Sequence, residues 1–110
     1  MNPSDRPRPI FSSLQDEPGG HASIETFVLG LSHHVDELQE AEVQRDFARV
    51  IELADGLAET SSTHGYEILS RCCEGVRNAA ESASAEDLHK ALVELTEIAH
   101  RIRLGYRGSV

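Results

Sequence analysis

Residues 46–69 read DFARVIELADGLAETSSTHGYEIL and specify one helix, a turn and the start of another helix. From Phe47 to Ala58, apolar residues recur at spacings of three and four, as they do in a helix that buries one face. Asp46 precedes this pattern and can accept a hydrogen bond from the first turn as its N-cap. The polar run 61–65 interrupts the pattern, so we expect the helix to end there.

Three further apolar stripes with helical spacing flank this segment. One covers 24–38 and follows Ser23, which is a predicted N-cap. Another covers 68–79, and the last covers 88–102 after Ser84, a second predicted N-cap with an acidic residue three positions later. Four amphipathic helices with short connections bury their stripes most simply against one another. The sequence therefore predicts an all-α fold, an antiparallel up-down four-helix bundle.

The N-terminal part of the chain differs in composition. Residues 1–8 are rich in proline and arginine and have no periodicity, so a disordered tail is predicted. The apolar residues that follow, Ile10, Phe11 and Leu14, predict a short lid segment that lies on the bundle. A Pro-Gly-Gly turn signal then precedes the first helix. We expect the bundle with its lid to span residues 9–107 as one domain.

The overall composition narrows the classes of function. The chain has 110 residues and a formal net charge of −9, with no basic cluster of the kind that binds nucleic acid. No apolar run approaches the roughly 18 residues of a membrane span, and none resembles a signal peptide. Cys72 and Cys73 are adjacent, which suits neither a stapling disulfide nor a zinc site. We expect a cytoplasmic protein that binds neither nucleic acid nor membrane.

The segment from residue 53 to residue 69 resembles the histidine-containing phosphotransfer (Hpt) family of two-component signalling. That family carries Ala-His-x-Leu-Lys-Gly on a helix, followed by a few small or apolar residues, a later glycine and a leucine. Here Ala54, Leu57, Gly65 and Leu69 match the frame. The resemblance extends over most of the chain, from about residue 9 to about 102. It implies a four-helix bundle that exchanges a phosphoryl group with, or binds, other signalling domains.

Three key residues of that family are replaced. Asp55 stands at the position of the phosphorylated histidine, Ala58 at that of the lysine that neutralises the phosphoryl group, and Glu59 at that of the glycine that lets a receiver domain approach. A carboxylate cannot serve as the nitrogen nucleophile. The resemblance therefore implies a non-catalytic phosphorelay module that binds a response-regulator receiver domain or a sensor histidine kinase, with no catalytic residue of its own.

The same helix carries an unusual surface pattern. Glu52, Asp55 and Glu59 lie three and four residues apart and form an acidic ridge of mutually repelling carboxylates. Gly56 lies in the helix interior, where glycine costs about 1 kcal/mol relative to alanine, so it can favour close contact with a partner. The predicted partner-binding residues are Glu52, Asp55, Gly56, Ala58, Glu59 and Ser62. The other interpretation is a solvated face with a glycine that has no role.

The carboxylates of the ridge could also be an acid–base pair, but a helix flank offers no cleft to separate their pKa values. We therefore expect neither an enzyme nor a small-molecule substrate.

The histidines offer alternatives to this interpretation. His64 is a candidate phosphoacceptor for genuine phosphotransfer, although at the end of a helix it can equally pack or cap the turn. Adjacent His33 and His34 are expected at the surface. The pairs Glu86–His89 and Glu97–His100 match the Glu-x-x-His unit of di-iron bundles, but both lie on one helix and outside its apolar stripe. We therefore expect no metal and no cofactor. A helical scaffold protein unrelated to phosphorelay remains the third alternative.

Overall fold

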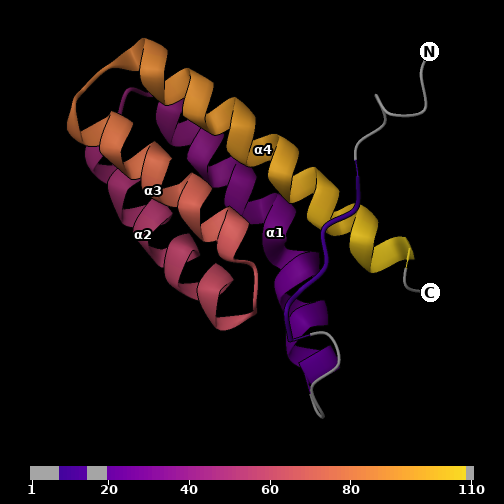
Figure 1. Cartoon of the computed structure of the whole chain (residues 1–110). Coiled ribbons are helices and arrows are strands. Elements are labelled where there is room, and N and C mark those ends of the chain that lie inside the picture. Colours follow the sequence, from indigo (N-terminus) through magenta and orange to yellow (C-terminus); the bar gives the residue numbers. More distant parts are fainter. Residues whose placement is uncertain (1–7, 15–19, 109–110) are drawn as a thin grey trace, which may run out of the picture.

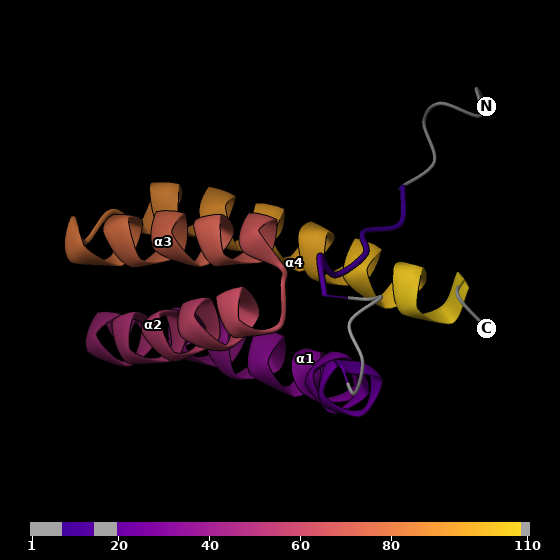
Figure 2. The same cartoon turned by 60° about the horizontal axis from the view of Figure 1, so that its bottom comes forward.

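A computed structural model describes residues 8–14 and 20–108 of the chain, and within these residues it contains helices and no strand. The four helices are α1 (Gly20–Val43), α2 (Phe47–Thr63), α3 (Glu67–Glu81) and α4 (Ala85–Gly108). Each helix packs against the next, and α4 returns to pack against α1. Figure 2 shows two layers, with α1 and α2 below α3 and α4. The predicted four-helix bundle is confirmed.

The long helices α1 and α4 extend past α2 and α3 at one end of the bundle (Figure 1). None of the helices in the described part of the chain is long and apolar enough to cross a membrane. The predicted disordered tail, residues 1–8, lies outside the described residues except for Arg8, and so do Pro18 and Gly19 of the predicted turn.

The predicted helix starts are partly correct. The Asp46 carboxylate accepts a hydrogen bond from the backbone N–H of Arg49 (3.1 Å), and the Ser84 hydroxyl accepts one from that of Asp87 (3.2 Å), so both N-caps are confirmed. The prediction for Ser23 was wrong. The helix begins at Gly20, which places Ser23 within the helix, and its hydroxyl lies 2.7 Å from Nε2 of His64, in the turn between α2 and α3.

The three turns between the helices share one backbone motif. Each has a single residue in the left-handed region, namely Arg45 (φ 59°), Gly65 (φ 80°) and Ala83 (φ 55°). The N–H of the following residue bonds to a carbonyl five positions earlier, as in Asp46 to Ala41. This is the Schellman arrangement, which satisfies the last carbonyls of a helix and reverses the chain tightly. Short turns of this kind hold consecutive helices antiparallel.

The core consists of the four apolar stripes. Leu69 and Leu95 are fully buried, as their stripes predict, and Cys73 is buried while Cys72 is half-buried. Burial raises the pKa of the Cys73 thiol to about 12, with smaller contributions from Cys72 and Glu74. The largest fully buried side chains come from all four helices: Leu31, Leu38, Val50, Leu69, Cys73, Val76, Leu88, Leu95 and Ile102.

The lid segment, residues 8–14, crosses the bundle from α4 to the turn between α2 and α3 (Figure 1). The N–H of Ile10 donates to the carbonyl of Arg101 (3.0 Å), and the N–H of Ser13 donates to the carbonyl of Gly65 (3.0 Å). The Arg101 guanidinium donates to the carbonyl of Arg8 (2.8 Å). The predicted lid is therefore present and is held largely through its main chain.

The lid segment does not cover the bundle mainly with apolar side chains. Ile10 packs against the core, whereas Phe11 is 51% exposed and Leu14 is 36% exposed. Two glycines make room for the segment, since a Cβ at Gly105 would meet the Ile10 carbonyl and one at Gly65 would meet the Ser12 and Ser13 hydroxyls. Close backbone approach therefore fixes the lid segment more than apolar burial does.

Candidate functional site

The acidic ridge lies on the solvent side of α2. The inward side of this helix is taken by Val50, Ala54, Leu57 and Ser61, which are buried. Glu52, Asp55 and Glu59 are all exposed, as is Ser62. Helical periodicity places these residues on one side of the helix, within about three turns. The side chains of the predicted acidic ridge are therefore exposed to solvent, and their role in binding stays a prediction.

A cation from another helix contacts the centre of the ridge. Arg77 on α3 lies with its Nε 2.8 Å from Oδ1 of Asp55, and its second nitrogen lies 3.1 Å from Glu81. The contact with Asp55 is close, but it is not aligned as a hydrogen bond. The Asp55 side chain remains 54% exposed, so solvent screens the pair and its contribution to stability is small. Asp55 is held in place but stays accessible.

The negative charges of Glu52 and Glu59 are neutralised to different extents by neighbouring cations. Arg49 lies 3.3 Å from Glu52 and also 3.3 Å from Glu37 on α1. Glu59 has no ion-pair partner among the described residues. Ser62 at the end of the ridge donates a hydrogen bond to Glu67 on α3 (2.8 Å). Together with their contacts, the ridge residues include six carboxylates and two guanidiniums, so the surface is acidic and complements a basic partner.

Gly56 opens the surface between Asp55 and Glu59. A Cβ at this position would have no heavy atom within 4 Å, so the bundle itself does not require glycine there. Gly56 is exposed, and its carbonyl accepts a hydrogen bond from the Thr60 hydroxyl (2.9 Å). The same open space surrounds Gly75 on α3, which provides a matched position away from the ridge. Gly56 leaves room for another molecule to approach the helix backbone.

Ala58 behaves differently from the other predicted site residues. It is half-buried and packs against the core rather than standing on the open surface. A longer side chain at this position would have to run along the surface before its end reached solvent. Ala58 therefore borders the ridge and does not form part of it.

His64 is built into the turn between α2 and α3. Its Nδ1 lies 2.7 Å from the Thr60 carbonyl, and its Nε2 lies 2.7 Å from the Ser23 hydroxyl of α1. A carbonyl only accepts, so Nδ1 carries the hydrogen and Nε2 of the neutral ring accepts from Ser23. The ring also stacks on Phe27, with centroids 4.9 Å apart. A phosphoryl group on Nε2 would have to displace Ser23.

The other histidines whose side chains the structure describes lie at the surface. His33 and His34 are exposed on α1 and lie near Glu37. His89 is exposed and lies 3.0 Å from Glu42, while His100 is also exposed. Within residues 8–14 and 20–108, no three His, Cys, Asp or Glu side chains gather in a way that could hold a metal ion.

Sequence reasoning missed Arg77. Its only local signal is the spacing of four residues to Glu81, which suggests an ion pair within α3. The contact with Asp55 depends on how α2 and α3 are aligned, which no motif specifies. Comparisons of the chain with protein-family models, with curated proteins and with solved structures gave no match, so the Hpt resemblance stays a prediction.

Proposed function

We propose that this protein is an Hpt-like phosphorelay module without a phosphoacceptor, which works in the cytoplasm by binding a partner through the exposed side of α2. The observation that carries the proposal is the combination of an exposed acidic ridge with the open surface at Gly56. Both features lie where the resemblance puts the phosphorylated histidine and its docking surface. The four-helix architecture supports the same proposal.

The charge of the surface favours one class of partner. The phosphorylation pocket of a receiver domain is itself acidic, so Glu52 and Glu59 should repel it. Arg49 and Arg77 reduce this repulsion but do not outnumber the carboxylates. The dimerisation bundle of a sensor histidine kinase is therefore the preferred partner, and a receiver domain with a basic rim is the second.

The proposal is tested by blocking the surface without disturbing the fold. Gly56→Gln adds a side chain where the bundle leaves open space, so the variant should fold. We expect it to weaken binding of the partner by at least about tenfold, because it prevents close approach to α2. Gly75→Gln makes the same change on α3 and should leave the affinity within about threefold.

The measurement is titration calorimetry against purified sensor-kinase bundles and receiver domains, beginning with those encoded beside the gene. Circular dichroism melts confirm that both glycine variants remain folded. If none of these domains binds the native chain, or if the two glycine variants weaken binding equally, the α2 surface is not the docking site.

A further inference from the structure

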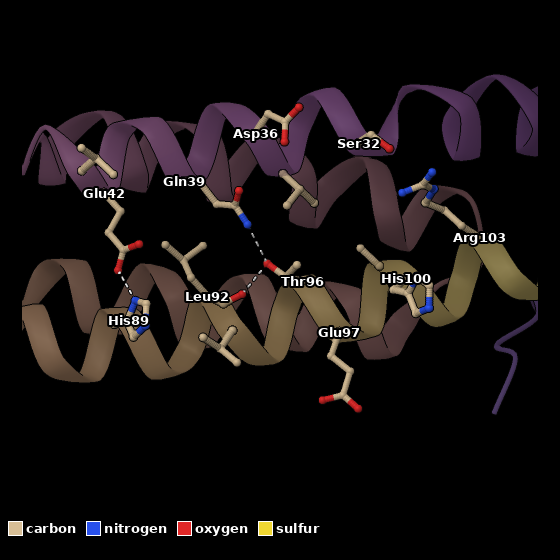
Figure 3. A pocket seen from close by; sticks show the side chains of 14 residues that line it. Ser32, Asp36, Gln39, Glu42, His89, Leu92, Thr96, Glu97, His100 and Arg103 are labelled. Atoms are coloured by element: carbon tan, nitrogen blue, oxygen red, sulfur yellow. Dashed lines mark hydrogen bonds and ion pairs between the residues drawn. The ribbon is translucent and has the colours of Figure 1, made fainter. Parts of the chain in front are cut away.

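A second surface lies on the other side of the bundle, between α1 and α4. These two helices are neighbours that no turn connects, and a groove of about 750 Å³ runs between them. Figure 3 shows the groove with α1 forming one wall and α4 the other. The ridge on α2 contributes no residue to the groove.

The base of the groove is apolar, and its open end exposes more apolar surface. Val35 and Leu92 lie in the base and are nearly buried. Val43 and Val93 line the same groove but are 80% and 55% exposed. Two exposed valines beside an apolar base leave surface that a partner can cover, which is characteristic of interaction sites.

Polar contacts across the groove hold the two walls together. The Gln39 amide of α1 donates to the Thr96 hydroxyl of α4 (3.2 Å), and His89 lies 3.0 Å from Glu42 (Figure 3). The Thr96 hydroxyl in turn donates to a backbone carbonyl of its own helix. Gln39, Thr96, Glu42 and His89 are therefore paired within the protein and join the two walls.

The charges on the walls indicate what the groove can bind. Asp36 on α1 and Glu97 on α4 line the groove from opposite walls (Figure 3). Both carboxylates are exposed, and neither has an ion-pair partner among the described residues. A ligand in the groove would meet one free carboxylate on each side, and the Arg103 guanidinium on the α4 wall. It therefore needs basic groups on both flanks of an apolar face.

The length of the groove completes the description of the ligand. The α1 wall runs from Ser32 to Val43, which corresponds to about 16 Å, or about three turns of a helix. We propose that the α1/α4 groove binds an amphipathic helix of about three turns, with an apolar stripe flanked on both sides by lysine or arginine. This proposal does not depend on the function proposed for α2.

A second copy of this chain would be a poor occupant. The chain carries 19 acidic and 10 basic residues, so the net charges of two copies repel each other. Pairing two copies would also bring Asp36 and Glu97 of both near one another, and like charges in an interface oppose association. Self-association is therefore an alternative that the test must distinguish.

The probe is a synthetic helical peptide of about 18 residues, long enough for the groove, with a leucine stripe and lysine on both flanks. A twin peptide carries glutamate in place of lysine. We expect fluorescence anisotropy to detect binding of the lysine peptide and not of the twin. The double variant Asp36→Lys/Glu97→Lys should weaken this binding by at least about tenfold.

The matched control makes the same charge change elsewhere. Glu74 on α3 and Glu94 on α4 are exposed and do not line this groove. Glu74→Lys/Glu94→Lys should leave the affinity within about threefold, since long-range attraction between exposed charges is screened. Val43→Asp and Val93→Asp, at exposed positions, should also weaken binding without unfolding the bundle.

Three results would overturn the proposal. The first is absence of binding by the lysine peptide. The second is an equal loss in the groove variant and in the control variant, which would indicate attraction to the net charge alone. The third is a dimer of the native chain in sedimentation equilibrium that the groove substitutions dissociate, because the groove would then be occupied by a second copy.

Discussion

Nε of Arg77 on α3 lies 2.8 Å from Oδ1 of Asp55 on α2, so a guanidinium lies beside the residue that the proposed Hpt resemblance aligns with the phosphorylated histidine. The same resemblance aligns Ala58 with the lysine of that family, and Arg77 brings a positive charge to this surface from the neighbouring helix. Glu81 shares that charge. A nucleophile at position 55 would thus have one cation nearby and the unpaired carboxylate of Glu59 on the following turn.

Restoring phosphotransfer should require more than the histidine. We expect no transfer to the native chain and none to Asp55→His, because Glu59 still repels a phosphoryl group and obstructs a receiver domain. The triple variant Asp55→His, Ala58→Lys, Glu59→Gly should accept label. The measurement is acid-labile radioactive phosphate on the chain after incubation with phosphorylated receiver domains.

A further substitution tests whether the charge of Arg77 assists phosphotransfer in the triple variant. If its charge assists the restored site, Arg77→Gln in the triple variant should slow labelling by about tenfold or more. The fold should tolerate these changes, since an exposed ion pair contributes under about 1 kcal/mol. Label on the native chain would contradict the proposed function and direct attention to His64.

The core can be tested at Leu69 of α3 and Leu95 of α4, which are both fully buried. We expect Leu→Ala at either position to lower the free energy of unfolding by about 2 to 5 kcal/mol, because each substitution leaves a cavity. Val93→Ala, at an exposed position, should change it by less than about 0.5 kcal/mol. Urea denaturation measures all three, and similar losses in all of them would show that these leucines do not form the core.

Alkaline pH should destabilise the fold through Cys73. The folded protein keeps its thiol proton until the pKa of about 12, whereas the unfolded chain releases it near 9. Above pH 9 the unfolded state therefore binds fewer protons, and the free energy of unfolding falls as pH rises toward 12. Urea unfolding between pH 8 and 10.5 should show a steeper fall for the native chain than for Cys73→Ala.

The pKa values of Tyr66 and Tyr106 are also raised, so these residues likewise lower the free energy of unfolding at alkaline pH. Both tyrosines are present in the native chain and in Cys73→Ala, so their effect cancels when the two are compared. Parallel pH profiles for the native chain and Cys73→Ala would mean that the thiol is not held protonated by the fold.

The lid segment can be tested with two glycines that lie within helices. Gly75→Ala should raise the free energy of unfolding by about 0.5 to 1 kcal/mol, because the position is open and alanine favours helix. Gly105→Ala should lack this gain or lower stability, since its methyl group meets the Ile10 carbonyl. Thermal melts compare the two variants, and limited proteolysis should cut residues 8–14 faster in Gly105→Ala. An equal gain at both positions would show that the lid segment does not lie on α4.

Local signals predicted a large part of this fold. The caps at Asp46 and Ser84 follow from side chains that bond to the adjacent turn, and the burial of Leu69 follows from helical spacing. Among the three turn residues with positive φ, Gly65 lies in the predicted turn region, whereas Arg45 gives no such signal, because few residues other than glycine favour this conformation.

The features that were missed join distant parts of the chain. Ser23 is a reasonable cap by sequence, but its hydroxyl bonds to His64, 41 residues later. The contact of Arg77 with Asp55 likewise depends on the alignment of two helices. The α1/α4 groove exists because two helices from opposite ends of the sequence lie side by side. None of these relationships has a local pattern that periodicity can detect.

The way in which the lid segment is attached determines which residues of the chain can be substituted without loss of docking. The bundle holds residues 8–14 mainly through hydrogen bonds to their backbone N–H and C=O groups. Every residue except proline carries both groups. Apart from Ile10, which packs against the core, and Ser12, whose hydroxyl bonds to the His64 carbonyl, the side chains of this segment can therefore vary with little effect on docking. The constraint falls instead on Gly65 and Gly105, which must stay without side chains to receive a segment remote from them in sequence.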